Sequence, residues 1–164
     1  MDLNEYNLSV RKWGSHLIRF INYSIKDMDA TKDITQDTFI VLWEKRQDVN
    51  IEKVKQFLFT VAFRKLINYK RAIKNTEDIN ENNTLLSIPN QVNFDDKQAI
   101  EVYMDNLPTI QKQVLILRDI EGYNYKEIEE IMKLSESQVK VYLFRARLQL
   151  KESYKKEDLK ISMN

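Results

Sequence analysis

The sequence contains no cysteine, which excludes disulfide frameworks, thiolate nucleophiles and cysteine-rich zinc sites. Its single histidine, His16, has no second histidine to help it hold a metal ion, and there is no glycine-rich phosphate-binding loop. We therefore predict no metal site, no cofactor, no catalytic residue and no enzymatic activity. No run of about eighteen apolar residues occurs, and the first residues do not have the pattern of a secretory signal. The chain is thus expected to be cytoplasmic, without membrane contact of its own.

Turn-forming residues are also scarce. Only two glycines and two prolines occur in 164 residues, too few for the tight turns of β-hairpins. An all-α fold is therefore predicted. Apolar residues recur at helical spacing and predict seven helices. These helices cover residues 8–23, 34–43, 54–73, 99–107, 110–120, 125–132 and 135–150.

The formal net charge is +1, but the charges are unevenly distributed along the chain. Residues 53–74 hold seven Lys or Arg and no acid, and residues 140–156 are again basic. Between these basic segments, residues 76–96 are rich in asparagine and acid and lack a sustained period, which is typical of a flexible linker. We therefore predict two small helical domains. The expected boundaries are 1–75, linker 76–96, 97–158 and a tail at 159–164.

The last two predicted helices form a pair with a short turn. Val139, Leu143 and Ala146 lie on one stripe of the last helix, and residues 133–135 join it to the helix before. Ser135 stands where a hydroxyl can cap the first turn. This arrangement is typical of a helix-turn-helix, whose second helix enters the major groove of DNA. On spacing alone, an amphipathic pair with a solvated basic face is an equally good interpretation.

Fixed spacings over some forty positions favour the helix-turn-helix. From Leu107-Pro108 onward, the segment resembles the fourth conserved domain of bacterial sigma factors of the extracytoplasmic function (ECF) type. The residues that carry the resemblance are Leu107-Pro108, Val114 to Leu117, Glu121-Gly122, Tyr125, Glu127-Ile128, Ser135, Val139-Lys140 and Arg145-Ala146-Arg147.

The amino-terminal half resembles the second domain of the same family. Its segment DATKDITQDTFIVLW, residues 29–43, is similar to the helix that binds core RNA polymerase at the β′ clamp helices. The resemblance implies polymerase contacts there, and a further contact between polymerase and sigma factor at the β flap. The residues that we expect to bind polymerase are Asp33, Gln36, Asp37, Phe39 and Trp43. Large aromatic residues are more often buried, so for Trp43 a place in the core is an equal alternative.

The following helix has an aromatic-to-basic stripe opposite its buried side. The members of the stripe are Phe57, Thr60, Arg64, Asn68 and Arg71. Such a stripe suits separated DNA strands, because bases stack on aromatic rings while cations follow the phosphates. The resemblance implies that this helix recognises and melts the minus-ten promoter element. Many family members have Asn where this chain has Arg64, so the preferred base is left open.

The resemblance implies a sigma factor that directs promoter-specific initiation and is controlled by an anti-sigma factor. Its minus-thirty-five residues are expected to be Ser137, Gln138, Lys140, Val141, Phe144, Arg145 and Arg147. Arginine can pair bidentately with guanine, which discriminates by about 1–3 kcal/mol. Two alternatives remain open, a stand-alone helix-turn-helix regulator and a helical interaction protein without a DNA role.

Overall fold

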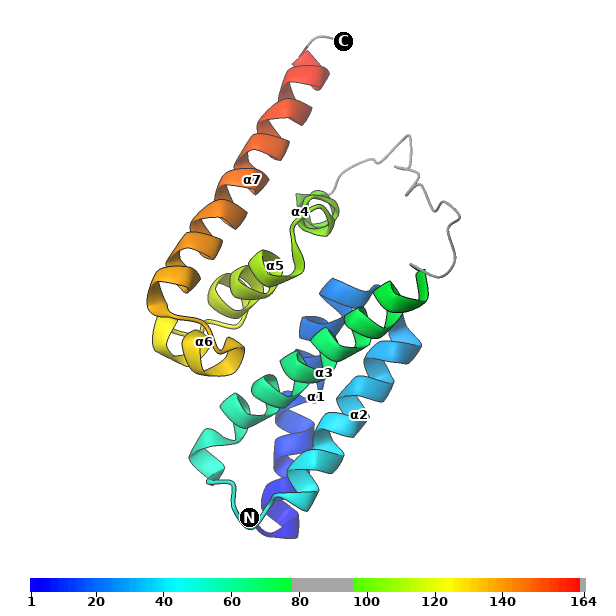
Figure 1. Cartoon of the computed structure of the whole chain (residues 1–164), viewed down its shortest axis with the longest axis vertical. Coiled ribbons are helices and arrows are strands. Elements are labelled where there is room, and N and C mark those ends of the chain that lie inside the picture. Colours follow the sequence, from blue (N-terminus) through cyan, green and yellow to red (C-terminus); the bar gives the residue numbers. More distant parts are fainter. Residues whose placement is uncertain (78–95, 163–164) are drawn as a thin grey trace.

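A computed structural model describes residues 1–77 and 96–162, and every element in these ranges is helical (Figure 1). The prediction of an all-α fold is confirmed. The N-terminal unit consists of α1 (Leu3–Ile25), α2 (Met28–Glu44), the short 3-10 turn η1 (Ile51–Lys53) and α3 (Val54–Glu77). The C-terminal unit consists of α4 (Asp96–Asp105), α5 (Thr109–Leu115), η2 (Ile116–Ile120), α6 (Tyr125–Met132) and α7 (Glu136–Ser162).

The N-terminal unit is a bundle in which α1, α2 and α3 pack against one another. Local capping sets the helix starts. Asp2 and Glu5 form a reciprocal capping box at α1, and the carboxylate of Asp27 accepts a hydrogen bond from the N–H of Ala30 at the start of α2. The left-handed conformation of Lys26 then ends α1 and turns the chain into α2.

The C-terminal unit contains the predicted helix-turn-helix. Asn124 and Glu127 form a capping box at α6, and Lys133 ends that helix in the left-handed conformation. The hydroxyl of Ser135 accepts from the N–H of Gln138, while the Gln138 side chain accepts from the N–H of Ser135. The N-cap predicted at Ser135 is therefore confirmed.

Two boundaries differ from the sequence prediction. Helix α7 continues to Ser162 instead of ending near residue 150, so most of the predicted tail 159–164 is helical. The segment predicted as α-helix over 110–120 changes to a π-helical turn at η2, where the N–H of Glu121 donates to the carbonyl of Ile116 at 2.9 Å. The predicted linker is also helical at both ends, and its residues 78–95 lie outside the described ranges.

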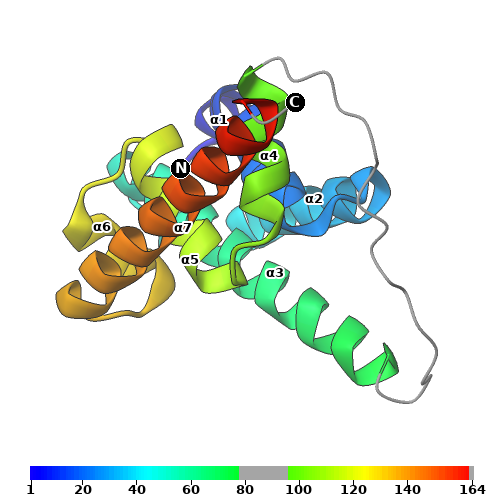
Figure 2. The same ribbon diagram turned by 90° about the horizontal axis from the view of Figure 1, so that it is seen from above.

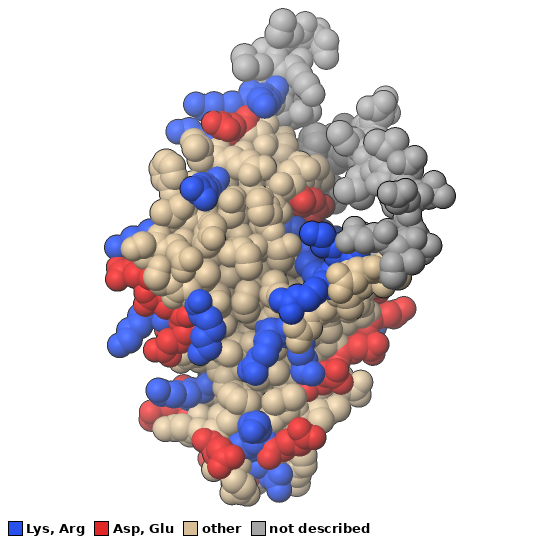
Figure 3. All heavy atoms as spheres, in the orientation of Figure 1, with Lys and Arg blue, Asp and Glu red and all other residues tan. Residues whose placement is uncertain are grey.

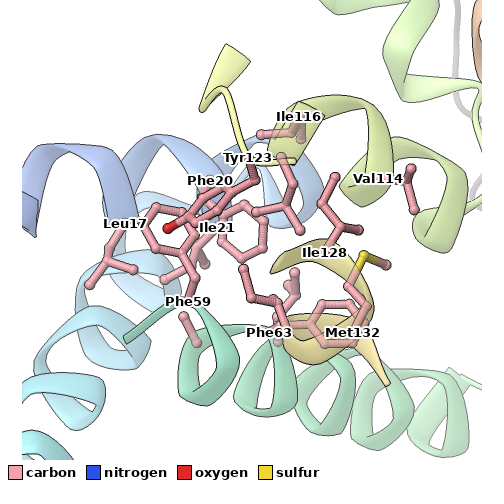
Figure 4. Close-up of a cluster of buried hydrophobic side chains, with 14 of the residues drawn as sticks. Leu17, Phe20, Ile21, Phe59, Phe63, Val114, Ile116, Tyr123, Ile128 and Met132 are labelled. Atoms are coloured by element: carbon pink, nitrogen blue, oxygen red, sulfur yellow. The ribbon is translucent and has the colours of Figure 1, made fainter. Parts of the chain in front are cut away.

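The two units are packed together. Helix α6 lies against α3, and α4 and α5 lie against α1 (Figure 1 and Figure 2). Figure 4 shows buried side chains running from α1 through α3 to α6 and η2 without a break. Sequence patterns predicted two domains but gave no sign of this shared core.

Among the described helices, none combines the length and the apolar character that a membrane-spanning helix requires.

Candidate functional site

One face of α2 presents a cluster of polar side chains. Asp33, Gln36 and Asp37 are exposed, whereas Ile34 and Leu42 on the other side of the helix are buried. The three polar residues therefore share the outward face, as the helical spacing predicted. Figure 3 shows Asp and Glu along the edge of the molecule where α2 lies.

The two aromatic residues predicted for this face differ in position. Phe39 is only 7% exposed and belongs to the core, so it offers little side-chain surface for the polymerase contact that was predicted. Trp43 is 37% exposed, its ring lying 4.0 Å from the guanidinium of Arg46 and edge-on to Tyr6. Ile40, 48% exposed, lies on the same outward side. The sequence analysis missed Ile40, although its spacing of three from Asp37 was a usable signal.

The predicted stripe on α3 lies on one side of that helix. Arg64, Asn68 and Arg71 are exposed, while Phe57 and Thr60 are partly buried. The Thr60 hydroxyl donates to a backbone carbonyl one turn earlier at 2.8 Å. Lys and Arg side chains gather over α3 in Figure 3, next to the acidic edge at α2. The stripe is thus a basic surface with an aromatic end.

Four members of the stripe line a cavity that the sequence gave no means of predicting. Its other wall comes from the C-terminal unit, at the end of α6 and the helix-turn-helix turn. The cavity has a volume of about 430 Å³ and no acidic residue in its lining, which consists of Thr60, Phe63, Arg64, Ile67, Asn68, Arg71, Ile131, Met132 and Lys133.

Helix α7 buries the predicted stripe and exposes the opposite face. Val139, Leu143 and Ala146 are at most 2% exposed, whereas Val141 is 43% exposed and Phe144 is 67% exposed. The remaining predicted recognition residues, Ser137, Gln138, Lys140, Arg145 and Arg147, are exposed as well. A helix with this composition can offer cations and an apolar ring together to a DNA groove.

Two of these cations are already paired. The Nζ of Lys140 lies 2.7 Å from Glu136, and this hydrogen bond raises the pKa of Lys140. The guanidinium of Arg147 holds Asp119 of η2 with two contacts of 2.5 and 3.0 Å, which raise the pKa of Arg147. Among the described residues, Arg145 has no such partner. The guanidinium of Arg145 is therefore available for a contact outside the chain, whereas Arg147 fastens α7 to η2.

A shallow hollow of about 380 Å³ adjoins the exposed Phe144 ring. Four of its lining residues, Tyr125, Leu143, Leu148 and Lys151, were not predicted as site residues. In the part of the chain that the structure describes, no group of His, Cys, Asp or Glu could hold a metal ion.

Comparison with known proteins decides the family. The family model for "Sigma-70, region 4" matches residues 97–150. The chain is 34% identical over 143 residues to the ECF RNA polymerase sigma factor SigM of Bacillus subtilis (strain 168), covering 83% of this chain and 86% of SigM. This chain belongs to the ECF sigma factors. A second B. subtilis relative, the RNA polymerase sigma factor YlaC, is 28% identical and covers 89% of this chain and 90% of its own length.

Solved structures share the fold of this ECF sigma factor. The sigma factor RpoE of Bartonella quintana, solved in complex with the anti-sigma factor NepR, matches with a TM-score of 0.78 and 21% identity over 93% of this chain and 98% of RpoE. CnrH, solved with the cytosolic domain of CnrY, matches with a TM-score of 0.64 and 20% identity over 90% of this chain and 85% of CnrH.

The match to region 4 includes the exposed face of α7. Its residues, 97–150, take in α5, η2, α6 and the first half of α7. The helix-turn-helix of this ECF sigma factor therefore lies inside the segment that matches region 4, and this match involves no residue of the N-terminal unit.

Proposed function

We propose that this chain binds core RNA polymerase and directs initiation at specific promoters, using three surfaces on two units. The face of α2 binds polymerase, the stripe on α3 handles the separated strands of the minus-ten element, and the outward face of α7 recognises the minus-thirty-five element. Because polymerase and promoter DNA are cytoplasmic in bacteria, this function implies that the protein works in the cytoplasm.

The polymerase surface is supported by the exposure of α2. Asp33, Gln36 and Asp37 can offer acceptors and donors to one partner helix, with the exposed side chains of Ile40 and Trp43 beside them. Asp37 also lies 3.6 Å from Lys65 on α3, but this ion pair is exposed and contributes little to stability. The carboxylate of Asp37 is therefore free to exchange Lys65 for a polymerase cation.

The minus-ten surface is supported by the chemistry of α3. Arg64 and Arg71 can follow phosphates, and Phe57 can stack with a base, at about 1–3 kcal/mol per stacked base. Separating the strands costs a few kcal/mol per unpaired base. Several such contacts are needed to offset that cost, which a continuous stripe provides.

The minus-thirty-five surface is supported by α7. Arg145 is exposed and unpaired within the described residues, and Phe144 and Val141 add apolar contact area suited to thymine methyl groups. Ser137 and Gln138 at the helix start are placed for phosphate or base contacts.

The observation that carries the proposal is the extent of the similarity to SigM. A match that covers 83% of this chain must include parts of both units, because the N-terminal unit ends at Glu77. A stand-alone helix-turn-helix regulator would need only the C-terminal match. We further propose control by an anti-sigma factor, since the two structural neighbours RpoE and CnrH were solved with their own protein partners NepR and CnrY.

The test is in vitro transcription with bacterial core polymerase on a library of promoter fragments. The proposal predicts new transcript start sites that depend on the added protein and share two sequence elements upstream. Transcription no different from that of core polymerase alone would reject it.

A further inference from the structure

A buried carboxylate joins the two units. Glu121 follows η2 in the C-terminal unit, and its side chain is only 1% exposed. The guanidinium of Arg19 on α1 contacts its Oε1 at 2.7 and 3.2 Å, and the Nδ1 of His16 lies 2.9 Å from its Oε2. We call this group the Glu121 latch. Both partners of the carboxylate lie about a hundred residues away in the sequence, in the other unit.

Contacts from α3 reinforce the latch. The Nζ of Lys55 lies 4.0 Å from the centre of the Tyr123 ring and 3.5 Å from the carbonyl oxygen of Glu121. The Tyr123 ring packs edge-on against Phe59, with 5.3 Å between the ring centres. Figure 4 shows both side chains in the same cluster. The amide of Gln56 further donates to the carboxylate of Glu130 on α6.

The packing places the end of α6 beside the minus-ten stripe, whose Arg64, Asn68 and Arg71 stay exposed. Ile131 and Met132 at the end of α6 are buried against α3, where Figure 4 shows Met132 next to Phe63. The stripe residues Thr60, Arg64 and Asn68 thereby form one wall of a cavity whose other wall is α6 and Lys133. A DNA strand that contacts Thr60, Arg64 and Asn68 from within this cavity would need part of the space that the end of α6 occupies.

The other two surfaces remain accessible. Asp33 and Asp37 on α2 are exposed, and so are Phe144 and Arg145 on α7. The closed arrangement therefore restricts access to one of the three proposed surfaces, the stripe on α3, and leaves the other two open.

We propose that the Glu121 latch holds the free protein in a closed, autoinhibited form, and that the C-terminal unit must move away before the minus-ten strand reaches α3. This inference rests on the proposed function. The physical basis of this proposal is the free-energy cost of removing a carboxylate from water. That cost is low only while Arg19 and His16 hold their contacts to Glu121. Loss of either contact favours the open form, in which Glu121 is solvated.

The test uses the absence of cysteine from the chain. Cysteines placed at the exposed positions Asn7 on α1 and Lys126 on α6 carry spin labels, and pulsed electron paramagnetic resonance measures the distance between them. The wild-type latch predicts a distribution dominated by one short, narrow peak. Arg19→Glu predicts a longer, broad one, and Arg19→Glu combined with Glu121→Arg predicts a return towards the short distance.

Controls separate the latch from general charge effects. Arg11→Glu makes the same charge change at an exposed position on the same helix and should leave the distance unchanged. If a charge reversal prevents folding, as judged by circular dichroism, Glu121→Gln removes the charge with little change of shape and should still lengthen the distance.

The inhibitory role has its own measurement. Affinity for a single-stranded DNA oligonucleotide, which the stripe on α3 is proposed to bind, should rise in Arg19→Glu as the open fraction rises, by roughly tenfold if one free wild-type molecule in ten is open. The inference is overturned if Arg19→Glu and Glu121→Gln keep the wild-type distance. It is overturned equally if the combined variant stays open, or if an opened variant gains no affinity. Failure of the proposed function would appear separately, as wild-type protein that supports no promoter-specific transcription whatever its distance distribution.

Discussion

The ionisation of a single residue, Lys112, makes the packing of the two units depend on pH. Its side chain, on α5, is 5% exposed, and its Nζ donates to the carbonyl oxygen of Tyr23 on α1 at 3.3 Å. Burial lowers the pKa of Lys112 from 10.5 to about 8, helped by the nearby charges of Lys70 and Lys26, while Asp105 acts in the opposite direction. Separation of the units would return Lys112 to water and restore its ordinary pKa.

A pH dependence of closure follows from this shift. Below about pH 8, Lys112 is protonated in both forms and contributes no pH dependence. Between about 8 and 10.5, the open form binds more protons than the closed form, so rising pH favours the closed form. The mean distance between labels in the Asn7→Cys, Lys126→Cys variant should therefore shorten from pH 8 to pH 9.5. Lys112→Met should remove that dependence; an unchanged slope in Lys112→Met would contradict the assignment.

The two glycines should respond oppositely to alanine. Gly122 has a φ of +75°, where a side chain is strained even though its Cβ would meet no atom within 4 Å. Gly14 lies inside α1, and its added Cβ also meets nothing within 4 Å. Gly122→Ala should lower the free energy of unfolding by about 1–3 kcal/mol. Gly14→Ala should raise it by about 0.5–1 kcal/mol. Chemical denaturation measures both, and equal signs would contradict the backbone assignment.

At the scale of elements, α2 and α7 are expected to act separately. Asp37→Ala should weaken binding to core polymerase about tenfold, roughly 1.4 kcal/mol, because it removes an exposed partner of the polymerase. Arg145→Ala should leave core binding intact but reduce use of the minus-thirty-five element, by about 1–3 kcal/mol of base discrimination. Equilibrium binding and transcription on promoters with and without that element measure the two effects. Equal losses in both assays for both variants would contradict the division.

Most elements were predictable because side-chain burial repeats with the helical period. The spacing of Val139, Leu143 and Ala146 predicted the buried side of α7. The stripe on α3 was predicted as the face opposite the apolar side of that helix. Helix α7 was nevertheless predicted too short, since the residues after Leu150 are mostly charged and carry no apolar stripe. The π-helical turn η2 was missed because a change in backbone hydrogen bonding leaves no mark on the residue pattern.

The candidate site was predicted less completely than the helices. Helical spacing showed which residues share a face, but it could not show that Phe39 is buried while Ile40 is exposed. That difference depends on how α2 packs against the other helices of its unit. The pairing of Arg147 with Asp119 likewise joins two elements whose distance in space is set by the tertiary fold.

At the scale of the whole molecule, the arrangement of the two units was the feature least accessible from sequence. Glu121 is part of a family motif, but its partners His16 and Arg19 belong to none of the motifs identified in the sequence. The single shared core arises because α6 of the C-terminal unit packs on α3 of the N-terminal unit. Since the units belong to one chain, each faces the other at a high effective concentration, and a modest interface suffices to hold them together.

Net charge and closure lead to the same expectation for the free protein. With a formal charge of +1, the chain as a whole attracts DNA weakly, and its minus-ten stripe faces α6. Selective promoter binding should therefore depend on polymerase, which places both units along the DNA.

The most direct test of the central claim is the binding of the purified chain to bacterial core RNA polymerase, followed by mass photometry. The account predicts a one-to-one complex that initiates at defined promoters and that Asp37→Ala weakens. Absence of a complex at micromolar concentrations of both components, with the chain folded and helical, would contradict it.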